Sequence, residues 1–158
     1  MTLRKQSMDT LLKNLTRDYP SLTFKAGAEF YWSPKEQIVY HRGSRRRSDA
    51  WTLLHEASHG ILQHKTFKSD YELLQLELAA WEKARELAKH YSITIDLDHI
   101  EDCLDTYRDW LHKRSLCPGC GMKSLQEDST TYSCFNCNEK WRVSSSRLCR
   151  PYRSRIEN

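Results

Sequence analysis

One twelve-residue stretch, Trp51 to Leu62, carries side chains whose spacing can support chemistry. It contains His55, Glu56 and His59 in the order His-Glu-x-x-His. Residues four positions apart lie on the same face of a helix, so the two imidazoles can hold one metal ion together. Zinc is the ion that this pattern favours, and Glu56 would stand beside the open coordination position, where it can accept a proton from water. The spacing therefore predicts zinc-dependent hydrolysis.

The residues around this motif favour a helix. Ser48 and Asp49 suit an N-cap and a first turn, and apolar side chains follow at helical spacing. These apolar positions are Leu53, Leu54, Ala57, Ile61 and Leu62. In the alternative interpretation, His55 and His59 are ordinary polar residues of a helix, paired with carboxylates.

A catalytic zinc site with two histidines needs one more protein ligand, which is often a carboxylate from elsewhere in the chain. Helical periodicity predicts a long helix from Tyr71 to Tyr91. On this helix Glu77 shares a face with small residues such as Ala80, which permit another helix to approach closely. We therefore expect Glu77 to be the third ligand, with Glu72 and Glu86 as alternatives.

The other apolar patterns predict an α+β domain around these two helices. Residues 7–18 and 98–113 have helical spacing, and residues 22–24 suit a short strand. The aromatic and β-branched runs 29–32 and 37–40 predict a β-hairpin. This hairpin would lie beside the metal helix, where its edge could pair with an extended peptide. Three histidines lack metal-ligand spacing and are expected at the surface: His90, His99 and His112.

The strongest single signal lies further along the chain, in two Cys-x-x-Cys pairs. Cys117 and Cys120 form the first pair, Cys134 and Cys137 form the second, and 13 residues separate the pairs. Four thiolates in two such knuckles are typical of the closed, tetrahedral zinc site of a zinc ribbon. A closed site leaves no coordination position for catalysis. We expect this module to support the fold or to recognise a partner.

Composition limits the class of protein. The chain has 158 residues, of which 39% are hydrophobic, and a mean hydropathy of −0.78, which suits one compact domain with an appendage. No apolar run approaches the length of a membrane span, and the first residues lack the apolar core of a signal peptide. We therefore expect a cytoplasmic protein with no membrane partner. Paired cysteines favour metal binding over disulfides; Cys103 and Cys149 stand outside the pairs, and Cys103 is expected in the core.

The net charge of +4 is concentrated near the end of the chain. From residue 138 onward there are six basic and two acidic residues, whereas the rest of the chain is neutral overall. This distribution favours at most a local contact with an anion. Near it, Tyr132, Phe135 and Trp141 could stack on nucleic-acid bases, cover the metal site or dock a protein. We expect a catalytic domain in residues 1–114, a ribbon in 115–143 and a flexible basic tail in 144–158.

Over about the first 114 residues the chain resembles the ImmA/IrrE-type zinc metallopeptidases. The resemblance rests on His55-Glu56-x-x-His59, the preceding hairpin and Glu77-x-x-Ala80 in the next helix. It implies a compact zincin-like fold of the gluzincin type, with His55, His59 and Glu77 as zinc ligands and Glu56 as general base. Members of that family cleave protein substrates, commonly repressors of mobile elements or stress regulons. Their usual neighbour is a helix-turn-helix, whereas a zinc ribbon follows here.

A metallopeptidase helix followed by a four-cysteine ribbon also resembles the SprT-like proteases, which are associated with DNA. Their third ligand is a histidine a few turns past the motif, but here His64 is too close and the next histidine is His90. A non-catalytic adaptor that binds nucleic acid or protein through its ribbon is a further alternative. The favoured interpretation has one catalytic and one structural zinc ion and an intracellular protein or peptide as substrate.

Overall fold

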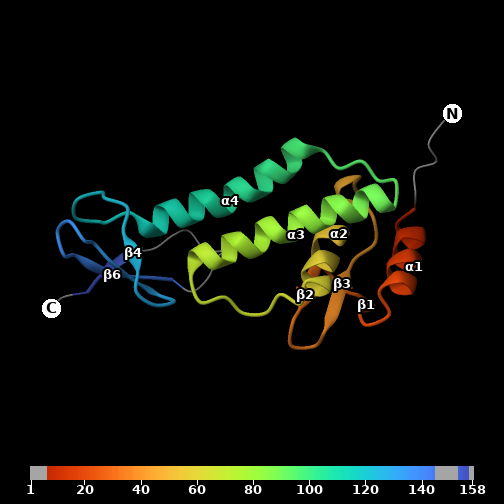
Figure 1. Cartoon of the computed structure of the whole chain (residues 1–158), viewed down its shortest axis with the longest axis horizontal. Coiled ribbons are helices and arrows are strands. Elements are labelled where there is room, and N and C mark those ends of the chain that lie inside the picture. Colours follow the sequence, from red (N-terminus) through yellow and green to blue (C-terminus); the bar gives the residue numbers. More distant parts are fainter. Residues whose placement is uncertain (1–6, 145–152, 157–158) are drawn as a thin grey trace. The chain divides into compact units, whose positions relative to one another are not determined.

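A computed structural model describes residues 7–144 and 153–156, which form four helices and two small sheets (Figure 1). This arrangement confirms the expected α+β class. None of the helices within the described residues is long and apolar enough to cross a membrane. In chain order the elements are α1 (Met8–Asp18), β1 (Thr23–Ala26), β2 (Tyr31–Ser33), β3 (Ile38–His41), α2 (Ser48–Ile61), α3 (Asp70–His90), α4 (Leu97–Ser115), β4 (Leu125–Gln126), β5 (Thr131–Ser133), β6 (Lys140–Val143) and β7 (Arg153–Arg155).

The chain divides into two compact units that share its two longest helices. The first unit comprises residues 1–66 and 76–100, and the second comprises 67–75 and 101–158. Helices α3 and α4 therefore contribute residues to both units. The expected boundary at residue 114 separates the two candidate metal motifs, whereas the two units are defined by packing. That boundary stays a prediction.

The first unit contains a three-stranded sheet in the order β1–β3–β2. Strands β2 and β3 form the expected hairpin, with Trp32 opposite Val39. The expected short strand β1 is also present, but it pairs in parallel with β3, with Phe24 opposite Val39. This parallel pairing arises because the link after β1 crosses to the far edge and leaves room for β3 between the two strands. The backbone N–H of Gly27, in that link, donates to the carbonyl of His41 at 2.7 Å.

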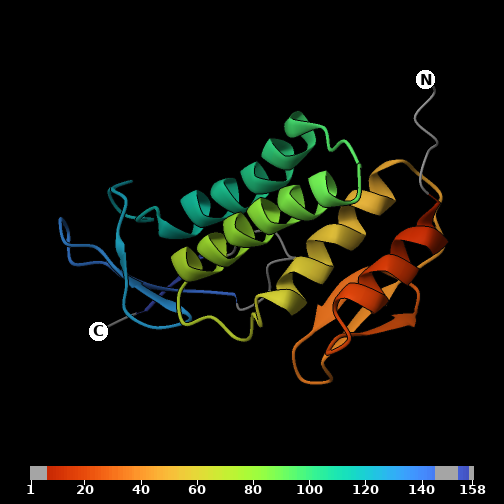
Figure 2. The same ribbon diagram turned by 45° about the vertical axis from the view of Figure 1, so that its right-hand side comes forward.

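The two faces of this sheet carry different side chains because successive residues of a strand point to opposite sides. Trp32 and Val39 are buried, and helix α2 lies along β2 and β3 (Figure 2). Tyr31 and Tyr40 occupy the opposite face, where their rings stack with centroids 4.6 Å apart. The sheet is therefore the surface on which the expected metal helix rests.

The second unit contains an antiparallel sheet in the order β4–β5–β6–β7. Strands β5 and β6 flank the second Cys-x-x-Cys pair. Strand β7 lies within the segment expected to be a flexible tail, and it pairs with β6 so that Arg153 stands opposite Val143. The guanidinium of Arg155 explains part of this pairing, since it donates to the carbonyl of Pro118 at 3.1 Å and forms an ion pair with Glu139 at 3.3 Å. The tail residues 145–152 and 157–158, including Arg147, Cys149 and Arg150, lie outside the described residues.

A buried ion pair joins the start of α3 to the end of α4 in this unit. The Arg114 guanidinium donates through Nε to Oδ2 of Asp70 at 2.7 Å and through Nη2 to Oδ1 at 3.3 Å. The side chains are 1% and 2% exposed, respectively. The Tyr132 hydroxyl donates to the same carboxylate at 2.6 Å, and the guanidinium lies 4.3 Å from the ring centroid of Trp110. Because all these groups are buried, each depends on its partner for compensation of lost hydration.

We predict that Asp70→Ala lowers the free energy of unfolding by about 3–5 kcal/mol, because it leaves the Arg114 charge buried without its partner. Urea unfolding followed by circular dichroism measures the change. The matched control is Glu101→Ala, which removes an exposed partner of Arg108 and is expected to change stability little. Equal effects of the two substitutions would contradict the importance of the buried pair.

Candidate metal centre

Helix α2 begins in a basic connector that a single carboxylate organises. Asp49, in the first turn, accepts hydrogen bonds from the backbone N–H groups of Arg45 at 2.6 Å and Arg46 at 2.9 Å. It also pairs with the guanidinium of Arg42 at 3.3 Å. Burial alone would raise the pKa of Asp49, but these donors outweigh it and hold the pKa below its usual value. The carboxylate thus fixes the start of the helix that carries the histidines.

The other end of α2 rests closely on the sheet. A Cβ atom at Gly60 would lie 3.1 Å from Leu22 Cδ2 and 3.1 Å from the six-membered ring of Trp32. Glycine is therefore the residue that allows the last turn of the helix, and with it His59, to approach the sheet this closely.

Three side-chain donors converge between helices α2 and α3. Nε2 of His55 lies 3.0 Å from Oε2 of Glu77, and Nε2 of His59 lies 3.3 Å from Oε1 of the same carboxylate. The two Nε2 atoms are 3.1 Å apart. All three residues are buried. This group is one of two within the described residues that could hold a metal ion, and it unites the three ligands expected from the sequence.

The Glu77 side chain remains ionised despite its burial. Burial by itself would raise the pKa of this carboxyl, but hydrogen bonds and the charge interaction with His55 and His59 outweigh burial and hold the pKa far below its usual value. Buried carboxylates are stable only when they are paired or coordinate a cation. The Glu77 carboxylate is thus a suitable partner for positive charge.

The alternative carboxylates have other partners. Glu72 accepts a hydrogen bond from the backbone N–H of Lys68 at 2.6 Å, and Glu86 is exposed and pairs with Lys83 at 2.8 Å. Neither belongs to the group of donors around His55. Among the three alternatives, Glu77 is the one that the structure places beside both histidines of the motif.

Glu56, the expected general base, is partly exposed and hydrogen-bonded to the neighbouring strand. The backbone N–H of Trp32 donates to its Oε2 at 2.8 Å. This hydrogen bond orients the carboxylate through Oε2, and the Trp32 N–H does not engage the other oxygen, Oε1. Strand β2, at the edge of the sheet, therefore holds the Glu56 side chain in place.

His64 has a place in this centre that the sequence analysis missed. Its Nδ1 lies 2.8 Å from Nδ1 of His59, and its backbone carbonyl accepts from the Trp32 indole Nε1–H at 2.8 Å. Burial, followed by the proximity of His59, lowers the pKa of His64. The sequence does carry a signal for this contact, since His64 follows His59 by only five residues; that spacing is too short for a metal ligand.

Aromatic rings hold the His55 imidazole from the other side. Trp81 of α3 stacks on it, with centroids 4.2 Å apart and planes 25° from parallel. His99 is half-buried and packs edge-on against Trp51 and Trp81, at centroid distances of 5.0 and 5.8 Å. His99 is therefore only partly at the surface, because two indoles cover its ring, whereas His90 and His112 are exposed as expected.

The cysteines form the second group that could hold a metal ion. The four sulfur atoms lie within 4.8 Å of one another, with Cys117 to Cys137 and Cys120 to Cys134 at 3.5 Å. The backbone N–H of Gly119 points at the Cys117 sulfur at 3.3 Å, as in a metal knuckle. Backbone N–H groups, that of Cys137 above all, lower the pKa of the Cys134 thiol to about 6. Such a thiol is readily converted to the thiolate that binds metals.

Two of the three ribbon aromatics are inside the second unit. Tyr132 and Trp141 are 2% and 0% exposed, and their rings stack with centroids 5.7 Å apart. The indole Nε1–H of Trp141 also donates to the carbonyl of Arg114 at 2.9 Å. A role for these two rings in stacking on bases is therefore wrong; they form a core with Cys117 and Cys134 instead. Phe135 is 66% exposed.

Comparison of the chain with known protein families, curated proteins and solved structures finds no significant match in any of the three. The site is therefore interpreted from its own residues.

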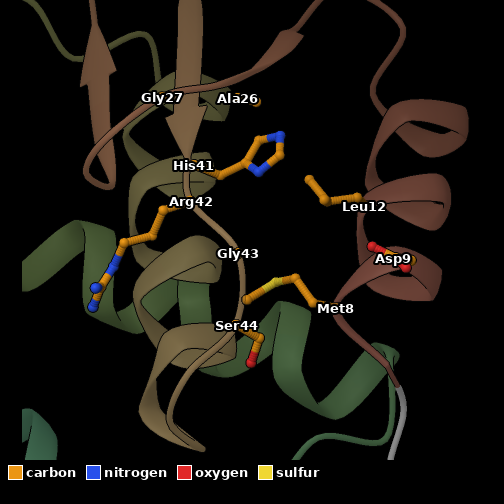
Figure 3. A pocket seen from close by; sticks show the side chains of 9 residues that line it. All are labelled: Met8, Asp9, Leu12, Ala26, Gly27, His41, Arg42, Gly43 and Ser44. Carbon is orange, nitrogen blue, oxygen red and sulfur yellow. The ribbon is translucent and has the colours of Figure 1, made fainter.

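A pocket of about 520 Å³ lies away from these donors, between the start of α1 and the end of β3. In Figure 3 the His41 imidazole extends toward Leu12 of α1, whereas the Arg42 side chain points away. The residues that line the pocket are Met8, Asp9, Leu12, Ala26, Gly27, His41, Arg42, Gly43 and Ser44. None of the metal-centre residues lines it, so this pocket is not the site described above.

We predict that Gly60→Ala lowers the free energy of unfolding by about 1–3 kcal/mol, because crowding against Trp32 and Leu22 exceeds the gain in helix propensity. Gly43→Ala is the control, since a Cβ atom there meets nothing within 4 Å. Chemical denaturation of both variants measures the difference. A Gly60→Ala protein more stable than wild type would show that the helix can retreat from the sheet at no cost.

Proposed function

We propose that this protein is a zinc-dependent metallopeptidase. Its catalytic zinc ligands are His55, His59 and Glu77, and Glu56 is its general base. The observation that carries the proposal is the convergence of three ligand atoms from two helices, at 3.0–3.3 Å from one another.

These distances fit a metal ion better than they fit hydrogen bonds alone. Corners of a tetrahedron around zinc lie about 3.3 Å apart when the metal–ligand bonds are about 2.0 Å. If both imidazoles instead carried a proton on Nε2, both N–H groups would aim at one carboxylate with their nitrogen atoms 3.1 Å apart. That arrangement would bring two donor hydrogens together, whereas one cation satisfies all three lone pairs. The chemistry of the donor set, two imidazoles and a carboxylate, matches the His2Glu class of catalytic zinc sites.

A zinc ion in this site would polarise the scissile carbonyl and lower the pKa of a water molecule in the open position. Glu56 would accept a proton from the attacking water and deliver it to the leaving amine nitrogen as the C–N bond breaks. The Trp32 N–H keeps the carboxylate in place for both transfers. Tyr31 and Tyr40 are unsuited to donate a hydrogen bond to the carbonyl oxygen, because they lie on the sheet face opposite Trp32.

We propose that the four cysteines bind a second zinc ion with a structural role. The Cys117–Cys137 and Cys120–Cys134 sulfur–sulfur distances of 3.5 Å are near the spacing of about 3.8 Å expected around a zinc ion with bonds of about 2.3 Å. Because Tyr132 and Trp141 are buried, the ribbon offers fewer surface aromatics to nucleic acid than its sequence suggests. This burial supports a ribbon that stabilises the second unit and contacts a protein substrate or partner. It disfavours an adaptor that binds nucleic acid by stacking on bases.

The proposal predicts two zinc ions per chain in the wild type and one in each of His55→Ala and Cys117→Ser. Each substitution removes a ligand from a different site, so the losses are independent. Inductively coupled plasma mass spectrometry measures the metal content, with His112→Ala, an exposed histidine, as the control that retains two ions. A His55→Ala protein that still carries two zinc ions would contradict the proposed catalytic site.

Glu56→Gln is expected to lower kcat/KM for peptide hydrolysis by about 10²–10⁴-fold, because the amide still accepts the Trp32 N–H but no longer accepts a proton from water. The assay uses a library of fluorogenic peptides together with denatured casein. Zinc content should stay at two ions. Glu86→Gln, an exposed carboxylate on α3, should retain full activity; unchanged activity of Glu56→Gln would remove Glu56 from the mechanism.

A further inference from the structure

We propose that His64 is a positioning residue, whose Nδ1 accepts a hydrogen bond from Nδ1–H of His59 and thereby aims the His59 Nε2 lone pair at the metal site. This inference rests on the proposed function, and it assigns to His64 a role distinct from that of a metal ligand. Three observations carry it: the contact between the two rings, the turn that brings His64 back to the helix, and the bond that holds its backbone.

Proton accounting fixes the direction of the hydrogen bond. A neutral imidazole carries one N–H, so a histidine that binds metal through Nε2 carries its hydrogen on Nδ1 and needs an acceptor there. The His59 Nδ1 lies 2.8 Å from the His64 Nδ1, which is an ordinary hydrogen-bond length. The hydrogen of His64 then resides on its Nε2, and its Nδ1 lone pair is free to accept.

The two proposed histidine ligands are held by different means. Among the described residues, the buried Nδ1 of His55 has no hydrogen-bond partner, and its ring is fixed by stacking on Trp81. The ring of His59 instead meets two imidazoles edge-on: its centroid lies 4.6 Å from that of His55 and 5.0 Å from that of His64, with the planes 85° and 70° apart. A hydrogen bond through Nδ1 adds a directional constraint on the rotation of the His59 ring.

The end of α2 is shaped so that His64 returns to His59. The N–H of His64 donates to the carbonyl of His59 at 3.0 Å, and the N–H of Gln63 donates to that of Gly60 at 3.1 Å. This pair of bonds is the Schellman motif, in which the chain reverses through one residue in the left-handed region. Gln63 has a φ of 55°, a conformation that usually takes glycine. Its amide compensates by donating to the Gly60 carbonyl at 2.8 Å.

Trp32 connects this support to the general base. Its indole Nε1–H donates to the His64 carbonyl at 2.8 Å, while its backbone N–H donates to Glu56 at 2.8 Å. One strand residue therefore holds the backbone of His64 and the carboxylate of Glu56 at the same time. The hydrogen bond from Trp32 holds the His64 backbone to the sheet and thereby keeps the His64 ring beside that of His59.

The test compares His64→Leu with His64→Asn. The two side chains have nearly the same shape, but Asn places an acceptor oxygen where the His64 Nδ1 stands, whereas Leu places a methyl group there. Zinc retained per chain is measured after dialysis against a graded series of chelator concentrations, with retention at the cysteine site as the internal reference. Loss of a residue that hydrogen-bonds to a metal ligand commonly weakens metal affinity by 10–100-fold.

We expect the zinc of the His55, His59 and Glu77 site to be lost from His64→Leu at chelator concentrations about 10–100-fold lower than from the wild type. His64→Asn should retain it nearly as well as the wild type does. Equal retention in Leu and Asn variants, whether high or low, would overturn the positioning role and leave the peptidase proposal standing. A wild-type chain that holds no zinc at this site would overturn both.

Discussion

The first unit depends on the neutralisation of one buried carboxylate. Glu77 is 4% exposed, and a charge so far from water is tolerated only beside compensating groups. The carboxylate faces Nε2 of His55 and of His59, and a metal ion shared by the three side chains would neutralise it. Helix α3 therefore has to pack closely against α2. Small residues on the same face of α3, Ala80 and Ala84, are fully buried and make that approach possible. The same close packing of α2 and α3 brings together three side chains that could hold a metal ion.

The residues that position this centre lie on strand β2 and at the two ends of helix α2, and they are not the candidate ligands themselves. Asp49 fixes the start of α2 by collecting N–H groups of the basic connector, and Gly60 lets its last turn settle on the sheet. Trp32 fills the space beside Gly60 and uses both of its N–H groups on residues of the centre. A rearrangement of strand β2 would therefore displace Glu56 and His64 together.

The parts of this structure that could be predicted from sequence are those with a local period. His55 and His59 share a face because they are four residues apart, and Glu77 was favoured because its neighbours on α3 are small. The hairpin followed from β-branched runs on either side of a turn. The parallel pairing of β1, the pairing of β7 and the Asp70–Arg114 ion pair had no such signal, because each joins residues distant in sequence. The burial of Tyr132 and Trp141 was hidden for the same reason: exposure of an aromatic ring depends on what else packs against it.

The two candidate metal groups differ in a way that suits different tasks. Four sulfur donors complete a tetrahedron and leave no position for a substrate, whereas two nitrogens and a carboxylate leave one corner open. The ribbon is small, and its core of Tyr132, Trp141 and Val143 adjoins Cys117 and Cys134, so its stability is expected to depend on its metal. The first unit instead has a core of its own, which includes Leu11, Leu15, Val39, Leu53 and Leu54.

The most direct test is a crystal structure of the purified protein with anomalous diffraction measured on both sides of the zinc absorption edge. The account predicts a zinc peak about 2.0–2.2 Å from His55 Nε2, His59 Nε2 and a Glu77 oxygen, in addition to the peak among the four sulfurs. An anomalous peak among the cysteines alone, with Glu77 bonded directly to protonated imidazoles, would contradict it.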